Sequence, residues 1–158
     1  MDQNGVQILL QSLEKKNQIL DQLISHNELQ EQLLKKEELN LNQMDQMLDE
    51  QGRLVEELDQ LDQGFETLYD RMREEIIGNK EKYRAQIGRM QECIQQITAK
   101  IATINAGNMR NKILAENQFK KQKQAIGQNK SIKRVATNYY NSMNNLNHVP
   151  PQFYDSKK

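Results

Sequence analysis

The sequence is poor in the residues that build compact globular cores. Its 158 residues include no Trp, and aromatic residues make up only 5% and hydrophobic residues 36% of the chain. So little large apolar surface favours elongated helices with extensive solvated faces over a compact core. A regular apolar period, described below, argues against disorder for most of the chain.

Cysteine and histidine are also scarce. Cys93 is the single cysteine, which excludes an internal disulfide framework and a cysteine-based metal cluster. We expect it to be a half-buried residue beside an apolar seam, with a reactive thiol as the minor alternative. The two His are far apart, and no Glu has a His three residues later. This pattern speaks against a Ser-His or Cys-His arrangement and against a di-iron helical bundle.

Motifs of common catalytic sites are missing as well. The chain contains no P-loop, Gly-rich dinucleotide turn, HExxH or nucleophile elbow. We therefore predict that the protein is not an enzyme and uses no cofactor and no metal. No apolar run approaches the roughly 18 residues of a membrane span, and the N-terminus lacks a basic stretch followed by an apolar one. We expect a cytoplasmic protein without membrane insertion.

Each half of the chain has few charges of one sign: the first half is poor in Lys and Arg, and the second is poor in Asp and Glu. Residues 1–78 carry 7 Lys and Arg against 18 Asp and Glu, hence −11, and residues 79–158 carry 15 against 4, hence +11. Either acidic early helices lie beside a basic later helix, or the basic half is a surface for an acidic partner, a nucleic acid or a membrane. No RNA-binding or zinc-finger motif accompanies the basic segment 110–134, and the acidic half would repel phosphates. We therefore predict no nucleic-acid partner.

An apolar period dominates the middle of the chain, in two runs separated by a slip near Gly78. The steps alternate between three and four residues, which is the period of a helix and not of a strand. In the first run a third apolar residue in most heptads widens the stripe, which favours contact with two neighbouring helices. Only Gln51 breaks the seam itself, and Asp62 breaks the added stripe. The seam residues are Met44, Met47, Gln51, Leu54, Leu58, Leu61, Phe65, Leu68 and Met72, then Tyr83, Ile87, Met90, Ile94, Ile97, Ile101 and Ile104.

These patterns predict an all-α fold. We expect an elongated antiparallel bundle of about three long, coiled-coil-like helices over residues 1–130, followed by a C-terminal amphipathic helix and aromatic tail over residues 131–158. Polar residues Lys16 and Asn27 interrupt the apolar side of the first helix. The long helices are placed at about residues 4–35, 42–77 and 80–126.

The ends of the second helix have local signals. Asn40 or Asn42 is expected to cap its start. Gly78 is expected to end it, because glycine adopts the left-handed cap conformation without a Cβ penalty. Inside it, Gly52 and Gly64 each cost about 1 kcal/mol relative to Ala. Either packing outweighs that cost or the two glycines mark the close approach of a neighbouring backbone.

The C-terminal segment differs in composition from the rest of the chain. Apolar residues fall at helical spacing from Ile132 to Leu146, and Tyr139, Tyr140, Phe153 and Tyr154 hold half of the aromatic residues. Tyr, Met and Phe bury much area at modest entropic cost, so such a helix suits a partner's groove. The segment therefore either folds back onto the bundle or docks a partner.

Several segments resemble the flagellar export chaperones of the FlgN/FliT class. They are the Leu-rich opening, QGRLVEEL at residues 51–58 and GFETLY at residues 64–69. The close is similar too, with the paired Tyr139 and Tyr140, a polar spacer and FYDSKK at residues 153–158. The resemblance covers nearly the whole chain and does not separate the two branches.

The resemblance implies a cytoplasmic chaperone of flagellar type III export. Such proteins bind the polymerisation-prone C-terminal helices of flagellar hook-associated or filament-cap proteins, keep them unassembled and bring them to the export gate, whose components are further partners. The family places much of its partner binding in the C-terminal region. On this sequence the implied partner-binding residues are Ile132, Val135, Tyr139, Tyr140, Met143, Leu146, Phe153 and Tyr154.

A coiled-coil structural or adaptor protein is the alternative. It would act by self-association through residues 44–104. Ile at both seam positions from Ile94 to Ile104 is compatible with higher-order coils. A homodimer is a further partner that we consider.

Overall fold

A computed structural model describes residues 2–126 and 130–146 of the chain. The all-α prediction is confirmed, because this part of the chain forms helices and no strand. The candidate residues Phe153 and Tyr154 lie outside the described residues. Leu146 ends the last helix, but its side chain also lies outside them. The helices are α1 (Asp2–Leu34), α2 (Leu41–Gly78), α3 (Arg84–Ile126) and α4 (Lys130–Leu146).

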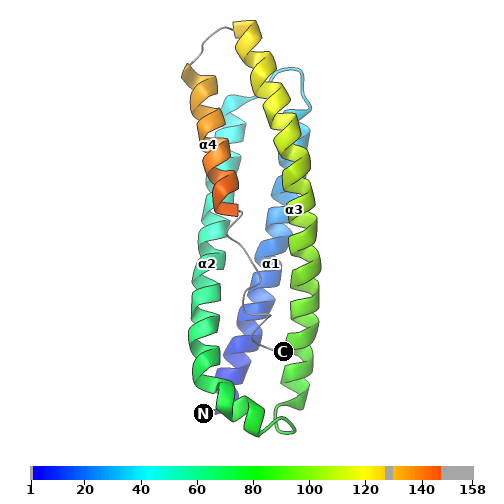
Figure 1. Ribbon diagram of the computed structural model, residues 1–158, viewed down its shortest axis with the longest axis vertical. Coiled ribbons are helices and arrows are strands. Elements are labelled where there is room, and N and C mark those ends of the chain that lie inside the picture. Colours follow the sequence, from blue (N-terminus) through cyan, green and yellow to red (C-terminus); the bar gives the residue numbers. More distant parts are fainter. Residues whose placement is uncertain (1, 127–129, 147–158) are drawn as a thin grey trace.

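The long helices lie side by side along one axis (Figure 1). α1 packs against both α2 and α3, while α4 packs against α2 and, less extensively, α3. The chain runs up α1, down α2, up α3 and down α4, so α1 and α3 are parallel (Figure 1). With 17 residues against 43 in α3, α4 covers only one end of its neighbours.

Side chains of Asn residues define the ends of α2. Asn40 caps its start, as predicted, because its side-chain oxygen accepts a hydrogen bond from the N–H of Gln43 at 3.1 Å. The helix ends at Gly78, but the expected left-handed glycine cap is wrong, since Gly78 does not adopt positive φ. The capping residue at this end is Asn79, whose Nδ2 donates to the carbonyl of Glu75 at 2.9 Å.

The turn after α2 is longer than predicted. Turn residues extend through Tyr83, so α3 begins at Arg84 rather than near residue 80. Tyr83 is fully buried, and its hydroxyl donates to the carboxylate of Glu75 at 3.3 Å. The buried ring therefore anchors the turn against the core.

Two other glycines mark close contacts. A Cβ added at Gly52 or Gly64 would meet nothing within 4 Å, so no neighbouring backbone approaches there. A Cβ at Gly5 would lie 2.8 Å from the sulfur of Met72, and one at Gly107 would lie 2.9 Å from Nδ2 of Asn27. The glycines with close side-chain neighbours thus lie in α1 and α3 rather than in α2.

Most seam residues of the apolar period form the core of the long helices. From Leu54 on they join most Leu residues of α1 in one cluster, while Met44 and Met47 belong to a second cluster. Each fully buried side chain of this size contributes about 1.5–3 kcal/mol of transfer free energy. The apolar surface of the seam is therefore largely buried by contacts within the chain. The buried seam members of this cluster are Leu58, Phe65, Tyr83, Met90, Ile97 and Ile104.

Buried amides replace apolar side chains near the end that α4 covers. Nε2 of Gln30 donates to Oε1 of Gln51 at 3.0 Å. Asn27 donates to the carbonyl of Ile104 at 3.3 Å, and Asn111 donates to the carbonyl of Asn27 at 2.9 Å. These bonds tie α1 to both neighbours, and buried polar pairs of this kind fix helix register.

Ion pairs link the acidic helices to the basic one. Glu14 pairs with Arg89 at 3.1 Å, and Asp21 pairs with Lys100 at 3.0 Å. Glu31 pairs with Arg110 at 2.8 Å further along the same two helices. These contacts confirm that acidic α1 lies beside basic α3. Exposed pairs are worth about 0–1 kcal/mol each, so they orient the helices more than they stabilise them.

None of the helices within residues 2–126 and 130–146 is long and apolar enough to cross a membrane.

Candidate partner-binding site

The inward face of α4 holds most of the candidate partner-binding residues. Ile132, Val135 and Tyr139 are 5%, 0% and 1% exposed, while Met143 is half-buried and Tyr140 is 38% exposed. The structure therefore brings the first three together against the chain's own helices. Of the two arrangements that the sequence left open, α4 here is folded back.

The site that receives α4 is apolar and partly aromatic. The rings of Phe119 and Tyr139 pack edge to face at 5.9 Å, and Tyr140 lies edge-on to Tyr139 at 5.5 Å. Aromatic pairs in this geometry add about 0.5–1.5 kcal/mol to the free energy of burial. The buried residues of this cluster from the rest of the chain are Leu33, Leu34, Leu39, Met44, Met47, Leu48, Ala115 and Phe119.

Polar contacts align α4 along α2. The guanidinium of Arg134 pairs with the carboxylate of Asp45, and Nδ2 of Asn138 donates to the same carboxylate at 3.4 Å. Asp45 lies near the start of α2. These bonds therefore fix α4 at the end of the molecule that also holds the buried amide side chains described above.

The hydroxyl of Tyr139 is a weak point of this docking. It is buried and has no hydrogen-bond partner among the described residues. Burial raises the pKa of this phenol well above its ordinary value. Burying a hydroxyl without a hydrogen-bond partner costs about 1–3 kcal/mol of stability, which offsets part of the stabilisation that the ring provides.

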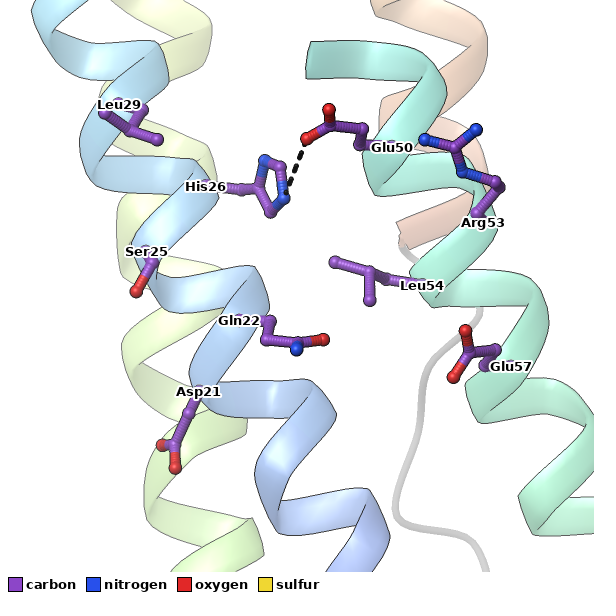
Figure 2. Close-up of a pocket in the computed structure, with 9 residues that line it drawn as sticks. All are labelled: Asp21, Gln22, Ser25, His26, Leu29, Glu50, Arg53, Leu54 and Glu57. Atoms are coloured by element: carbon purple, nitrogen blue, oxygen red, sulfur yellow. Dashed lines mark ion pairs between the residues drawn. The ribbon is translucent and has the colours of Figure 1, made fainter. Parts of the chain in front are cut away.

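A separate pocket of about 470 Å³ lies between α1 and α2. In Figure 2, His26 of α1 projects across it toward Glu50 of α2, and Leu54 lies beneath this pair. Nε2 of His26 is 3.5 Å from Oε2 of Glu50, while Nδ1 is buried without a partner among the described residues. The pocket's charged lining residues are the acidic Asp21, Glu50 and Glu57 and the basic Arg53. The lining residues are Asp21, Gln22, Ser25, His26, Leu29, Glu50, Arg53, Leu54 and Glu57.

The side chains around this pocket do not form a cluster of metal ligands. Over the part of the chain that the structure describes, no three His, Cys, Asp or Glu side chains converge as metal ligands.

Cys93 is half-buried against the core, as predicted. Burial, followed by the nearby Glu14, raises the pKa of its thiol, which makes it a poor nucleophile at neutral pH.

Sequence reasoning missed one buried ionic contact. Lys16 of α1 is 1% exposed, and its Nζ lies 2.7 Å from Oδ1 of Asp62 in α2. Each residue was visible as an interruption of an apolar stripe, but nothing in the sequence paired the two interruptions.

Comparisons of the chain with protein-family models, with curated proteins and with solved structures found no match.

Proposed function

We propose that this protein is a cytoplasmic, helix-binding chaperone rather than an enzyme, and that α4 is its client-binding element. Its clients would be hook-associated or filament-cap subunits of the bacterial flagellum, as the sequence resemblance implies. The observation that best supports the proposal is the docking of α4. A short amphipathic helix already occupies an apolar, helix-wide site on the chain's own surface.

In this proposal α4 leaves its site and gives its apolar face to a client helix. Ile132, Val135 and Tyr139 then contact the client instead of α2 and α3. Three such side chains at about 2 kcal/mol each amount to roughly 6 kcal/mol before the ordering of α4 is subtracted. Opening α4 exposes this one short helix and its site, while the contacts of α1 with α2 and α3 remain.

The chaperone mechanism would be competitive masking. A client helix that polymerises exposes an apolar stripe, and α4 covers that stripe until export. Since apolar area is buried, binding should show a negative heat-capacity change.

The experiment uses a reversible lock on α4. A bis-maleimide cross-linker with a reductant-cleavable spacer, attached to Asp45→Cys and Arg134→Cys in a Cys93→Ser background, joins α4 to α2 across the existing contact of the two residues. The binding of C-terminal helices from hook-associated and filament-cap subunits is measured by calorimetry with and without reductant. We expect binding only after reduction. The Cys93→Ser chain, unlocked in both conditions, is the control.

Equal binding by locked and reduced protein would contradict the role of α4. Loss of binding after truncation at residue 128 would agree with it, and undiminished binding by that truncated chain would count against it. Failure of every flagellar subunit to bind the reduced protein would reject the flagellar clients.

The structural-adaptor alternative has less support. Self-association through residues 44–104 would use the seam, but Leu58, Met90 and Ile97 of that seam are buried within one chain. A scaffold would have to use a different surface.

A further inference from the structure

The outward face of α3 carries the two most exposed large apolar side chains of the described residues. Met109 is 71% and Ile113 is 62% exposed, and they lie one helical turn apart. The residues that α3 turns toward α1 include Ile104 and Asn111, which are 6% and 1% exposed. Met109 precedes Asn111 by two residues, about 200° around the helix, so it points away from the core.

This face continues toward the start of the helix at the same spacing of three and four residues. Ala106, Ala102 and Ala99 follow in line, and all three are exposed. The apolar face therefore has large side chains at one end and small ones at the other. It extends for about 21 Å, and Glu92 and Lys120 lie on the same line beyond its two ends.

We propose that this face is the contact between two copies of the chain, paired antiparallel about a two-fold axis at Ala106. Ile113 and Ala99 are each seven residues from Ala106, so the Ile of one copy meets the Ala of the other. Met109 is three residues from Ala106 and Ala102 is four, so these two side chains meet with an offset of one residue, about 1.5 Å along the helix. Large side chains thus fit against small ones along the whole contact, as an isologous interface requires.

Charge complementarity specifies the same pairing. Glu92 and Lys120 are each fourteen residues from Ala106, so Glu92 of each copy meets Lys120 of the other. Both residues are exposed. A parallel pairing would instead place Glu92 against Glu92 and Met109 against Met109, which combines like-charge repulsion with poor packing. The face therefore favours the antiparallel dimer.

The apolar part of the contact is smaller than a standard protein interface. We therefore expect a reversible dimer with a dissociation constant in the micromolar range. α4 contributes nothing to it, and the dimer does not rest on the proposed chaperone function. A truncation that abolishes client binding should leave dimerisation unchanged.

Sedimentation equilibrium of the full chain, from micromolar to submillimolar concentration, tests the proposal. We expect a monomer–dimer equilibrium in which Met109→Glu with Ile113→Glu raises the dissociation constant at least about tenfold. The matched control is Ile77→Glu, at a residue that is 52% exposed on α2, which should not change it. Thermal unfolding by circular dichroism should be similar for all three proteins, because the altered residues are exposed.

Charge reversal tests the geometry independently. Glu92→Lys should weaken the dimer, since it places Lys against Lys120 at both ends. Adding Lys120→Glu should restore it. A monomer at all concentrations, a dimer weakened equally by Ile77→Glu, or a double reversal that fails to restore association would overturn the proposal. Binding of a client helix to this face without self-association would overturn it as well.

Discussion

Nζ of Lys16 lies 2.7 Å from Oδ1 of Asp62 across the contact between α1 and α2, and Lys16 is almost completely buried. Each residue breaks an apolar stripe of its own helix, and the two breaks meet. Burying an ion pair rarely adds net stability over an apolar pair, but removing one partner leaves a buried charge with less compensation. The contact therefore aligns α1 with α2 more than it stabilises them.

We expect Asp62→Asn to lower the free energy of unfolding by about 1–3 kcal/mol, less than for a fully buried pair because the Asp62 side chain is 27% exposed. The double variant Lys16→Met with Asp62→Leu should be as stable as the parent or more so, because apolar side chains of similar size fill the space. Urea unfolding followed by circular dichroism measures both. A double variant less stable than Asp62→Asn would show that the pair contributes more than alignment.

The same site gives a pH dependence. Burial lowers the pKa of Lys16, and the carboxylate of Asp62 opposes this, so Asp62→Asn should lower it further. A lysine with a lowered pKa binds fewer protons in the folded than in the unfolded state between its folded value and its ordinary value of 10.5. Stability should therefore rise with pH through that window, more steeply in Asp62→Asn than in the parent. Urea midpoints at neutral and alkaline pH give the two slopes, and parallel slopes would contradict the assignment.

Glycine substitutions should separate open positions from close contacts. Gly64→Ala should stabilise the protein by about 0.5–1 kcal/mol, because its Cβ meets nothing and alanine favours the helix. Gly107→Ala should destabilise it by about 1–2 kcal/mol, since its Cβ displaces the buried Asn27 amide and breaks the bond to Ile104. Thermal melts compare the two, and a stabilising Gly107→Ala would mean that Asn27 can move freely.

Two substitutions of Tyr139 should distinguish the contribution of its ring to the docking of α4 from that of its hydroxyl. Tyr139→Phe removes the buried, unpartnered hydroxyl and should leave α4 as stable or up to about 1 kcal/mol more stable. Tyr139→Ala should cost about 3–5 kcal/mol of local stability, because the ring fills the apolar site. Hydrogen exchange of the α4 amides measures both. A large loss of protection in Tyr139→Phe would reveal a partner for the hydroxyl.

Much of the fold could be predicted from the sequence because helix formation depends on local period. The steps of three and four from Met44 to Ile104 predicted the helices and most of their buried residues, and Asn40 was one of the two residues expected to cap α2. The start of α3 was placed four residues early, since the burial of Tyr83 in the turn is a tertiary contact. For the same reason, the sequence did not show that the surroundings of Gly52 and Gly64 are open.

For the candidate site, the sequence placed Ile132, Val135 and Tyr139 on one face of one helix, because their spacing alone decides which side they share. What that face contacts was decided only by the tertiary structure. The polar interruptions follow the same division: Lys16, Gln51 and Asp62 were visible as breaks, but their partners lie on other helices. A periodic pattern fixes the direction of a side chain around its own helix, whereas pairing depends on the relative shift and rotation of two helices, which no single segment encodes.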